Sequence, residues 1–136
     1  MKVKVIIDEP KRVTKWASEH LENHPRLLWT QAFGFEFEGK LVGAVVFTDY
    51  SKNDIHVSVA STNPIWWQRR FLRAMYEYVW NQCGCLRISA MASEVNRKSR
   101  KLLERLGFKE EGRLRNFHGE HDAVVYGQLR SECKWI

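Results

Sequence analysis

The segment from Asn96 to Gly112, NRKSRKLLERLGFKEEG, limits the possible folds of this chain more than any other part. Asn96 suits the N-cap of a helix, and Gly107 suits the position after its end, where a left-handed residue closes the last turn. Leucines at helical spacing form one apolar face, and basic residues cover the other face and the first turn. Because the first turn is the positive pole of a helix, basic residues there predict an anionic ligand.

The rest of the chain predicts an α/β fold with a mixed sheet. Alternating apolar and polar residues predict strands, and apolar residues at helical spacing predict helices. The order of elements contains two strand–helix crossovers, which are typical of a sheet that is partly parallel and partly antiparallel. The predicted strands cover residues 2–8, 31–38, 41–50, 55–60, 86–92, 108–117 and 123–130, and the helices begin near Pro10, Pro64 and Asn96.

A chain of 136 residues is long enough for one continuous core, so we predict a single domain over residues 1–136. No apolar run is long enough to cross a bilayer, and the first residues read as a charged strand, so we expect a cytoplasmic protein without membrane contact. The cysteines, Cys83, Cys85 and Cys133, show no paired spacing and are expected as free thiols. The net charge of +6 favours anionic partners such as a phosphorylated cofactor or nucleic acid.

The segment that begins at Asn96 resembles the cofactor-binding half of the GNAT family of N-acetyltransferases. The likeness rests on Asn96 and Ser99 in an N-x-x-S helix start, on L-G-F at 106–108 and on E-G at 111–112. The form is most similar to the branch that includes ribosomal-protein N-terminal acetyltransferases, and residues 64–135 also resemble small phage and prophage proteins of this kind. The resemblance implies a twisted mixed sheet, splayed between two central parallel strands, with helices on both faces.

The resemblance also implies direct acetyl transfer from acetyl-CoA to a primary amine, on a protein N-terminus, a lysine or a small molecule. Asn96 would then bond the pantetheine arm, and the backbone amides near Ser58 and Val59 would hold the oxyanion. Many relatives place a tyrosine one turn after Ser99 as the acid for the leaving thiolate. Leu103 occupies that position here, so we name Ser99 as the replacement. Taken without the resemblance, Asn96 and Ser99 are a capping residue and a small packing residue.

The turn before the second helix is the other predicted cofactor site. In the family this turn carries a Q/R-x-x-G-x-G/A signature whose glycines let the backbone approach the pyrophosphate. Here the glycine and alanine positions hold larger residues, so we expect arginine side chains to compensate with charge-assisted contacts. An exposed basic helix start, with Asn63 as its cap, remains the alternative. The predicted cofactor residues of this turn are Gln68, Arg69, Arg70, Phe71, Leu72 and Arg73.

An amine must be neutral when it attacks, so a protonated amine first has to give a proton to a base. We name His56, because it lies on the strand predicted to face acetyl-CoA, although a half-buried structural histidine would show the same pattern. His118 and His121 share a predicted hairpin tip, which would not hold them as metal ligands, so no metal site is expected. His20 is expected to be a buried core histidine. The other candidate bases are Asp54, Glu36 and Glu38.

The same departures from the family pattern also fit a protein that keeps the fold without catalysis. Absent glycines and the missing tyrosine would suit a basic binding module that contacts nucleic acid or a host protein. As an enzyme, the chain would have acetyl-CoA and an amine-bearing acceptor as partners, with nucleic acid a weaker expectation, and would act as a monomer or homodimer. The Trp66–Trp67 pair, at a predicted helix start, is expected to stay partly exposed.

Overall fold

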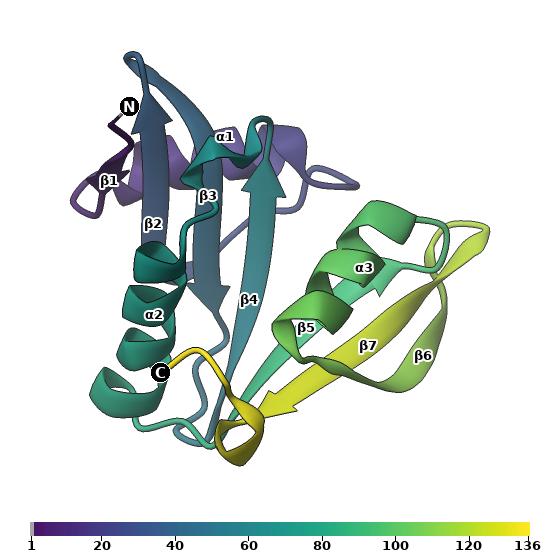
Figure 1. The fold of residues 1–136 in the computed structure, drawn as a ribbon. Helices are drawn as coiled ribbons and strands as arrows, with labels where there is room; N and C mark the ends of the chain where they lie inside the picture. Colours follow the sequence, from purple (N-terminus) through teal and green to yellow (C-terminus); the bar gives the residue numbers. More distant parts are fainter. Residues whose placement is uncertain (1) are drawn as a thin grey trace.

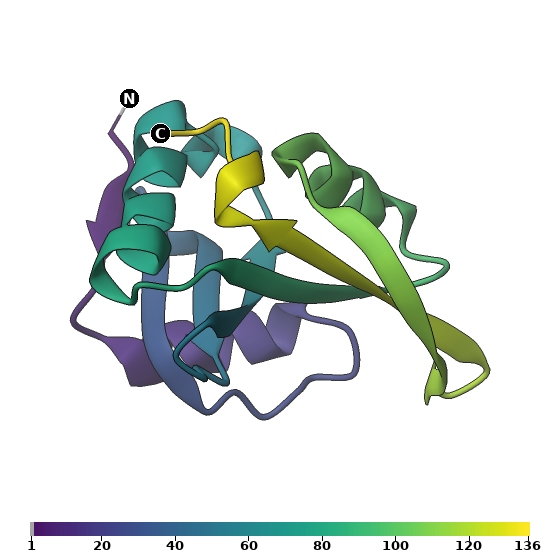
Figure 2. The ribbon, with the colours of Figure 1, turned by 90° about the horizontal axis from the view of Figure 1, so that it is seen from below.

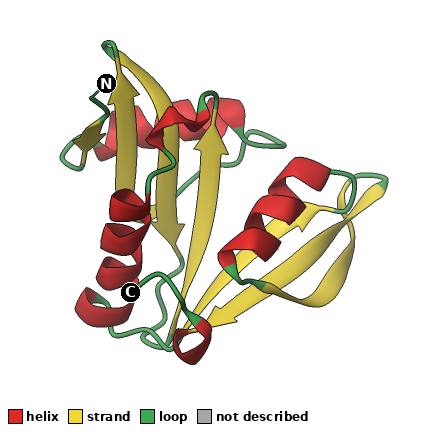
Figure 3. Cartoon of the chain, in the orientation of Figure 1, coloured by secondary structure: helices red, strands yellow, loops and turns green. Residues whose placement is uncertain are grey.

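A computed structural model describes residues 2–136 of the chain as seven strands in one mixed sheet, with helices on both faces (Figures 1 and 3). The main elements are β1 (Lys4–Ile6), α1 (Pro10–His20), β2 (Trp29–Phe37), β3 (Lys40–Thr48), β4 (Asp54–Ser61), α2 (Arg69–Glu77), β5 (Arg87–Ser93), α3 (Arg97–Leu106), β6 (Lys109–His118) and β7 (His121–Leu129). The strand order is β1-β2-β3-β4-β5-β7-β6. The predicted α/β fold and the predicted order of elements are confirmed.

The two central strands, β4 and β5, are parallel and lie side by side at one end only. Their pairing runs from Asp54 opposite Arg87 to His56 opposite Ser89. Beyond that point β4 stays paired with β3, and β5 stays paired with β7. Figure 1 shows the two strands diverging from their shared end, so the sheet splits into a V. The predicted splay between two central parallel strands is therefore present.

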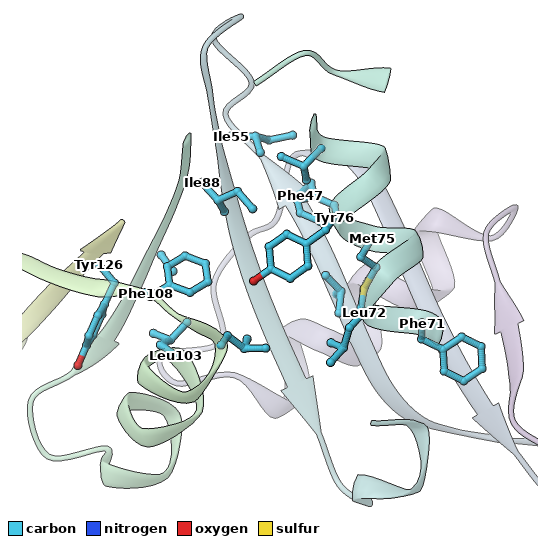
Figure 4. Close-up of a cluster of buried hydrophobic side chains, with 14 of the residues drawn as sticks. Phe47, Ile55, Phe71, Leu72, Met75, Tyr76, Ile88, Leu103, Phe108 and Tyr126 are labelled. Atoms are coloured by element: carbon cyan, nitrogen blue, oxygen red, sulfur yellow. The ribbon is translucent and has the colours of Figure 1, made fainter. Parts of the chain in front are cut away.

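Helix α1 packs on one face of the sheet, and α2 and α3 lie on the other (Figure 2). The larger core lies beneath α2 and α3 and is filled by aromatic and branched side chains. In Figure 4, residues of α2 lie on one side of this core and Leu103 and Phe108 on the other, over the strands that carry Phe47, Ile55 and Ile88. Burial of this kind supplies most of the stability of a domain of this size.

A buried glutamine joins both of these helices to the sheet. Gln128, on β7, accepts a hydrogen bond from the Tyr76 hydroxyl of α2 at 2.7 Å. Its amide nitrogen donates to the carbonyl oxygen of Leu106, the last residue of α3, at 2.9 Å. Gly107 follows with a φ of 108°, and a Cβ there would lie 2.8 Å from the same nitrogen. The bonds of Gln128 therefore fix α2 and α3 relative to each other across the V.

The second helix differs from its prediction. Asn63 caps a short 3₁₀ turn, Pro64–Trp66, and α2 begins only at Arg69, so the predicted continuous start at Pro64 is wrong. The cause is Trp66, which is 0% exposed and stacks on Phe35 with ring centroids 4.5 Å apart. The 3₁₀ turn thus carries an indole that is part of the core. The expectation that the Trp66–Trp67 pair is not buried in full is confirmed, because Trp67 is only half-buried, although Trp66 is fully buried.

The other helix ends agree with the sequence. Pro10 begins α1, and Asn96 caps α3 by accepting a hydrogen bond from the Ser99 amide at 3.1 Å. The expectation of a buried His20 is wrong, because its ring is exposed and stacks on Trp16 with centroids 4.2 Å apart. Among residues 2–136, no helix is long and apolar enough to cross a membrane.

Candidate functional site

A cavity of about 270 Å³ fills the opening between β4 and β5. Four of the predicted site residues come together in its wall: Ser58 and Val59 from β4, and Asn96 and Ser99 from the start of α3. The opening exists because β4 leaves β5 after His56, so that the β4 edge from Val57 onward has no strand beside it on that side. Strand edges and helix starts both present backbone amides, so this wall suits a polar, extended ligand.

Asn96 has both ends of its side chain engaged. Its oxygen accepts from the Ser99 amide, and its nitrogen donates to the Glu22 carboxylate at 2.7 Å. The second Glu22 oxygen accepts from the Ser93 amide at 3.3 Å. The Ser99 hydroxyl, in contrast, has no hydrogen-bond partner among residues 2–136 and lies half-buried in the cavity wall. Leu103, which lines the same cavity, is buried. Ser99 is therefore available as a donor to a ligand, and Glu22 is a polar residue of the site that the sequence did not single out.

A second cavity, of about 300 Å³, opens at the mouth of the V between α3 and the turn after β4. Lys98, Lys101 and Arg105 of α3 line it, opposite the turn residues 61–67. Among the described residues, none of these three side chains has an ion-pair or hydrogen-bond partner. Unpaired basic side chains around a cavity of this size suit a phosphorylated ligand.

The predicted residues of the turn, Gln68 to Arg73, lie beside this mouth but do not line it. Gln68 precedes α2 without a side-chain cap, and its carbonyl oxygen accepts from the amides of Phe71 and Leu72 at 3.0 and 3.1 Å. The side chains of Phe71 and Leu72 are buried in the core. Their role as cofactor contacts stays a prediction. The backbone amides of Arg69 and Arg70, at the start of α2, have no acceptor within the helix.

The three arginines of the turn all contact other protein groups. The Arg69 guanidinium carbon lies 5.5 Å from the centre of the Trp135 ring, and that of Arg70 lies 4.4 Å from the Phe71 ring. Arg70 also donates to the Gln68 side chain at 3.0 Å, and Arg73 pairs with Glu77 on the exposed side of α2. A phosphate contact by Arg69 or Arg70 would have to compete with this stacking.

A third cavity, of about 340 Å³, lies where the loop between α1 and β2 meets the tip of the β6–β7 hairpin. The loop and the hairpin are joined through the side chains of Asn23 and His118. The wall combines carboxylates, histidines and apolar side chains; the polar members include Glu22, Asp49, His56 and His118, and the apolar ones include Leu28, Met91 and Phe117.

His56 lies in the wall of this third cavity. Burial lowers its pKa below the ordinary value of 6.5, against the carboxylates of Asp49 and Asp54, which act to raise it. At neutral pH the imidazole is therefore uncharged and able to accept a proton. Asp54, by contrast, is engaged with Arg87 and Ser89, and Glu36 is paired with Arg12. Among the predicted bases, His56 is the one that lines one of these three cavities.

The lowered pKa of His56 predicts a pH-dependent stability. As the pH falls through about 6.5, the unfolded chain binds a proton before the folded chain does, so the free energy of unfolding decreases until the lower folded pKa is also passed. His56→Gln should shrink the loss of stability between pH 7.5 and pH 5.5, measured by urea unfolding. His20→Gln, which changes an exposed histidine, is the control for the substitution itself. An unchanged loss in His56→Gln would contradict this account.

Comparisons with known proteins agree with this geometry. The family model described as Acetyltransferase (GNAT) domain matches residues 6–109. Among curated proteins, none matches the chain. A ribosomal-protein-S5-alanine acetyltransferase from Vibrio fischeri superposes with a TM-score of 0.71 at 17% identity, over 98% of this chain and 96% of that one. A spermidine/spermine N-acetyltransferase from Vibrio cholerae gives 0.73 at 14% identity, over 96% and 94% of the two chains.

A GNAT-family acetyltransferase from Bacillus anthracis is 24% identical, with a TM-score of 0.60 over 74% of this chain and 67% of that one. This chain spans 60% and 62% of the length of two other acetyltransferase structures. At these identities the structural matches show the fold, and the family assignment rests on the match of the family model to more than half of the 136 residues. The chain, with its sheet split between two parallel strands, belongs to the GNAT family of acetyltransferases.

Proposed function

We propose that this protein is an N-acetyltransferase that takes its acetyl group from acetyl-CoA and passes it to a primary amine. The observation that carries the proposal is that neighbouring cavities share wall residues, so that the three cavities form a row with the V in the middle. The mouth and the V share Ser61, Lys98 and Leu102, and the V and the third cavity share residues that include Ser58 and Glu22. A phosphate-bearing donor could therefore lie with its phosphates at the basic mouth and its other end in the V. An amine could reach that other end through the third cavity.

The residues present fit such a donor. Acetyl-CoA would supply the acetyl group as a reactive thioester. Lys98, Lys101 and Arg105 would bind its phosphates at the mouth, with Arg69 and Arg70 beside them. The β4 edge at Ser58 and Val59 and the start of α3 would bind the extended arm. The Asn96 side chain, held by Glu22 and the Ser99 amide, would fix the start of α3 against that arm.

The protons of the reaction can be assigned to residues of the wall. A C–N bond forms and a C–S bond breaks, so the amine loses a proton and the thiolate gains one. Neutral His56 would accept the proton of the amine, directly or through water. The unpartnered Ser99 hydroxyl would donate toward the sulfur through water. Amides near Ser58 and Val59 would stabilise the oxyanion as it forms.

The acceptor is an amine that enters through the third cavity, and a protein N-terminus, a lysine side chain and a small amine all remain candidates. Both similar enzymes from Vibrio act on amines, one on a ribosomal protein and one on spermidine or spermine. The protein would work in the cytoplasm, where its three free cysteines stay reduced.

The first test is acetyl transfer itself. Purified protein with acetyl-CoA and a panel of amines should give acetylated product by mass spectrometry, and CoA should raise the melting temperature by mass action. Ser99→Ala should keep the CoA affinity but slow single-turnover transfer, by roughly tenfold to a hundredfold, because its hydroxyl acts only as the thiolate leaves.

Ser51→Ala, which changes a serine outside the three cavities, is the matched control and should keep the parental rate. Equal rates for Ser99→Ala and the parent would remove Ser99 from the mechanism. Failure of CoA to bind, together with salt-sensitive binding of nucleic acid, would instead favour the non-catalytic binding module.

A further inference from the structure

The carboxylate of Glu22 occupies the junction between the V and the third cavity. Among the described residues, it is the one acidic side chain that lines both cavities. Its two oxygens accept hydrogen bonds from the Asn96 side chain and the Ser93 amide, which hold the carboxylate in place without neutralising its charge. No lysine, arginine or histidine among residues 2–136 forms an ion pair with it. The carboxylate is therefore exposed and held by two hydrogen bonds at the point where donor and acceptor would meet.

From this placement we infer that Glu22 binds the ammonium group of the acceptor, and that the acceptor is a strongly basic aliphatic amine. The inference rests on the proposed function. An aliphatic amine arrives as an ammonium ion at neutral pH, and a protein of net charge +6 repels it in general. A fixed carboxylate at the junction would counter that repulsion and hold the nitrogen beside the arm of the donor, in the cavity that His56 also lines.

The apolar part of the same wall indicates what the ammonium is attached to. Leu28 and Phe117 are 71% and 52% exposed, and both line the third cavity with Met91. Exposed apolar side chains around a charged group suit a ligand that has an alkyl stem behind its ammonium. The side chain of lysine and simple alkylamines have this form, whereas an aromatic amine is uncharged at neutral pH and gains nothing from the carboxylate.

The test compares two acceptors in two variants. n-Butylamine is charged at pH 7.5 and has an alkyl stem, and aniline is uncharged. Glu22→Gln keeps a hydrogen-bond acceptor for Asn96 or Ser93 but removes the charge. We expect it to lower kcat/KM for butylamine about tenfold, mainly through KM, and to change kcat/KM for aniline less than twofold. Glu19→Gln removes the same charge from the last turn of α1, outside all three cavities, and should change neither.

A structural role would give a different result. If Glu22 acted only by holding Asn96 and the start of α3, both acceptors would lose rate equally, and the inference would be overturned. An unchanged kcat/KM for butylamine would overturn it as well, while leaving the proposed function intact.

A binding experiment keeps the inference testable without turnover. Titration of the protein with butylammonium, followed by NMR, should give saturable shifts at the amides of Glu22 and Ser93 that Glu22→Gln abolishes. Absence of such shifts in the parent would overturn the inference. Saturable shifts in a protein that transfers no acetyl group would support ammonium binding and sink the proposed function instead.

Discussion

Replacing Gly43 with alanine is expected to lower the free energy of unfolding by about 3 kcal/mol and the melting temperature by roughly 10 °C. A Cβ at this position of β3 would lie 2.2 Å from the indole nitrogen of Trp66 and 2.3 Å from its ring carbon Cε2. The indole cannot move aside easily, because it is fully buried, stacks on Phe35 and donates to the Ser61 hydroxyl at 2.9 Å. Overpacking against a held ring costs more than overpacking against a flexible side chain.

The effect of Gly43→Ala should depend on Trp66. Trp66→Leu alone creates a cavity and is expected to cost about 3 kcal/mol or more, but it also frees space for the new methyl group. The double variant should therefore be more stable than the sum of the single effects predicts, which a double-mutant cycle of urea unfolding would measure. Gly112→Ala is the control, since a Cβ there has no atom within 4 Å. A stability of Gly43→Ala near that of the parent, or additive effects, would contradict the packing argument.

The sequence predicts most of this fold because its local signals agree with one another. Asn96 and Gly107 mark both ends of α3, and Pro10 marks the start of α1, as the structure shows. The second helix is the exception. Asn63 and Pro64 form a normal signal for the start of a helix. Trp66 of this segment is instead buried in the core against Gly43, and this long-range packing overrides the local helix propensity. Local sequence patterns do not contain that contact.

The candidate site is only partly predictable from the sequence, for the same reason. The family resemblance predicts one site with Ser58, Val59, Asn96 and Ser99, and the structure brings these residues into one cavity wall. No sequence pattern predicts the role of Glu22, because it lies in a loop and its hydrogen-bond partner Asn96 is 74 residues away in the sequence. Long-range pairs of this kind depend on how α1 and α3 sit on the sheet, which periodicity and capping do not determine.

Both α2 and α3 carry basic side chains near the mouth, and either helix could supply the charges that bind the CoA phosphates. The arginines at the start of α2 are the predicted contacts, but Arg69 stacks on Trp135 and Arg70 stacks on Phe71. Lys101 and Arg105 of α3 line the mouth and have no partner among the described residues. A side chain without a competing contact loses nothing when it binds a phosphate, so we expect the α3 pair to contribute more.

Two variants with equal loss of charge would decide between the helices. Lys101→Ala combined with Arg105→Ala should weaken CoA binding roughly tenfold to a hundredfold in calorimetry, whereas Arg69→Ala combined with Arg70→Ala should weaken it less. Both effects should be small for pantetheine, which carries no phosphate, and dephospho-CoA would separate the 3′-phosphate from the pyrophosphate. The larger loss in the α2 pair would show instead that its arginines leave Trp135 and Phe71 for the ligand, and that charge at the start of α2 replaces the missing glycine turn.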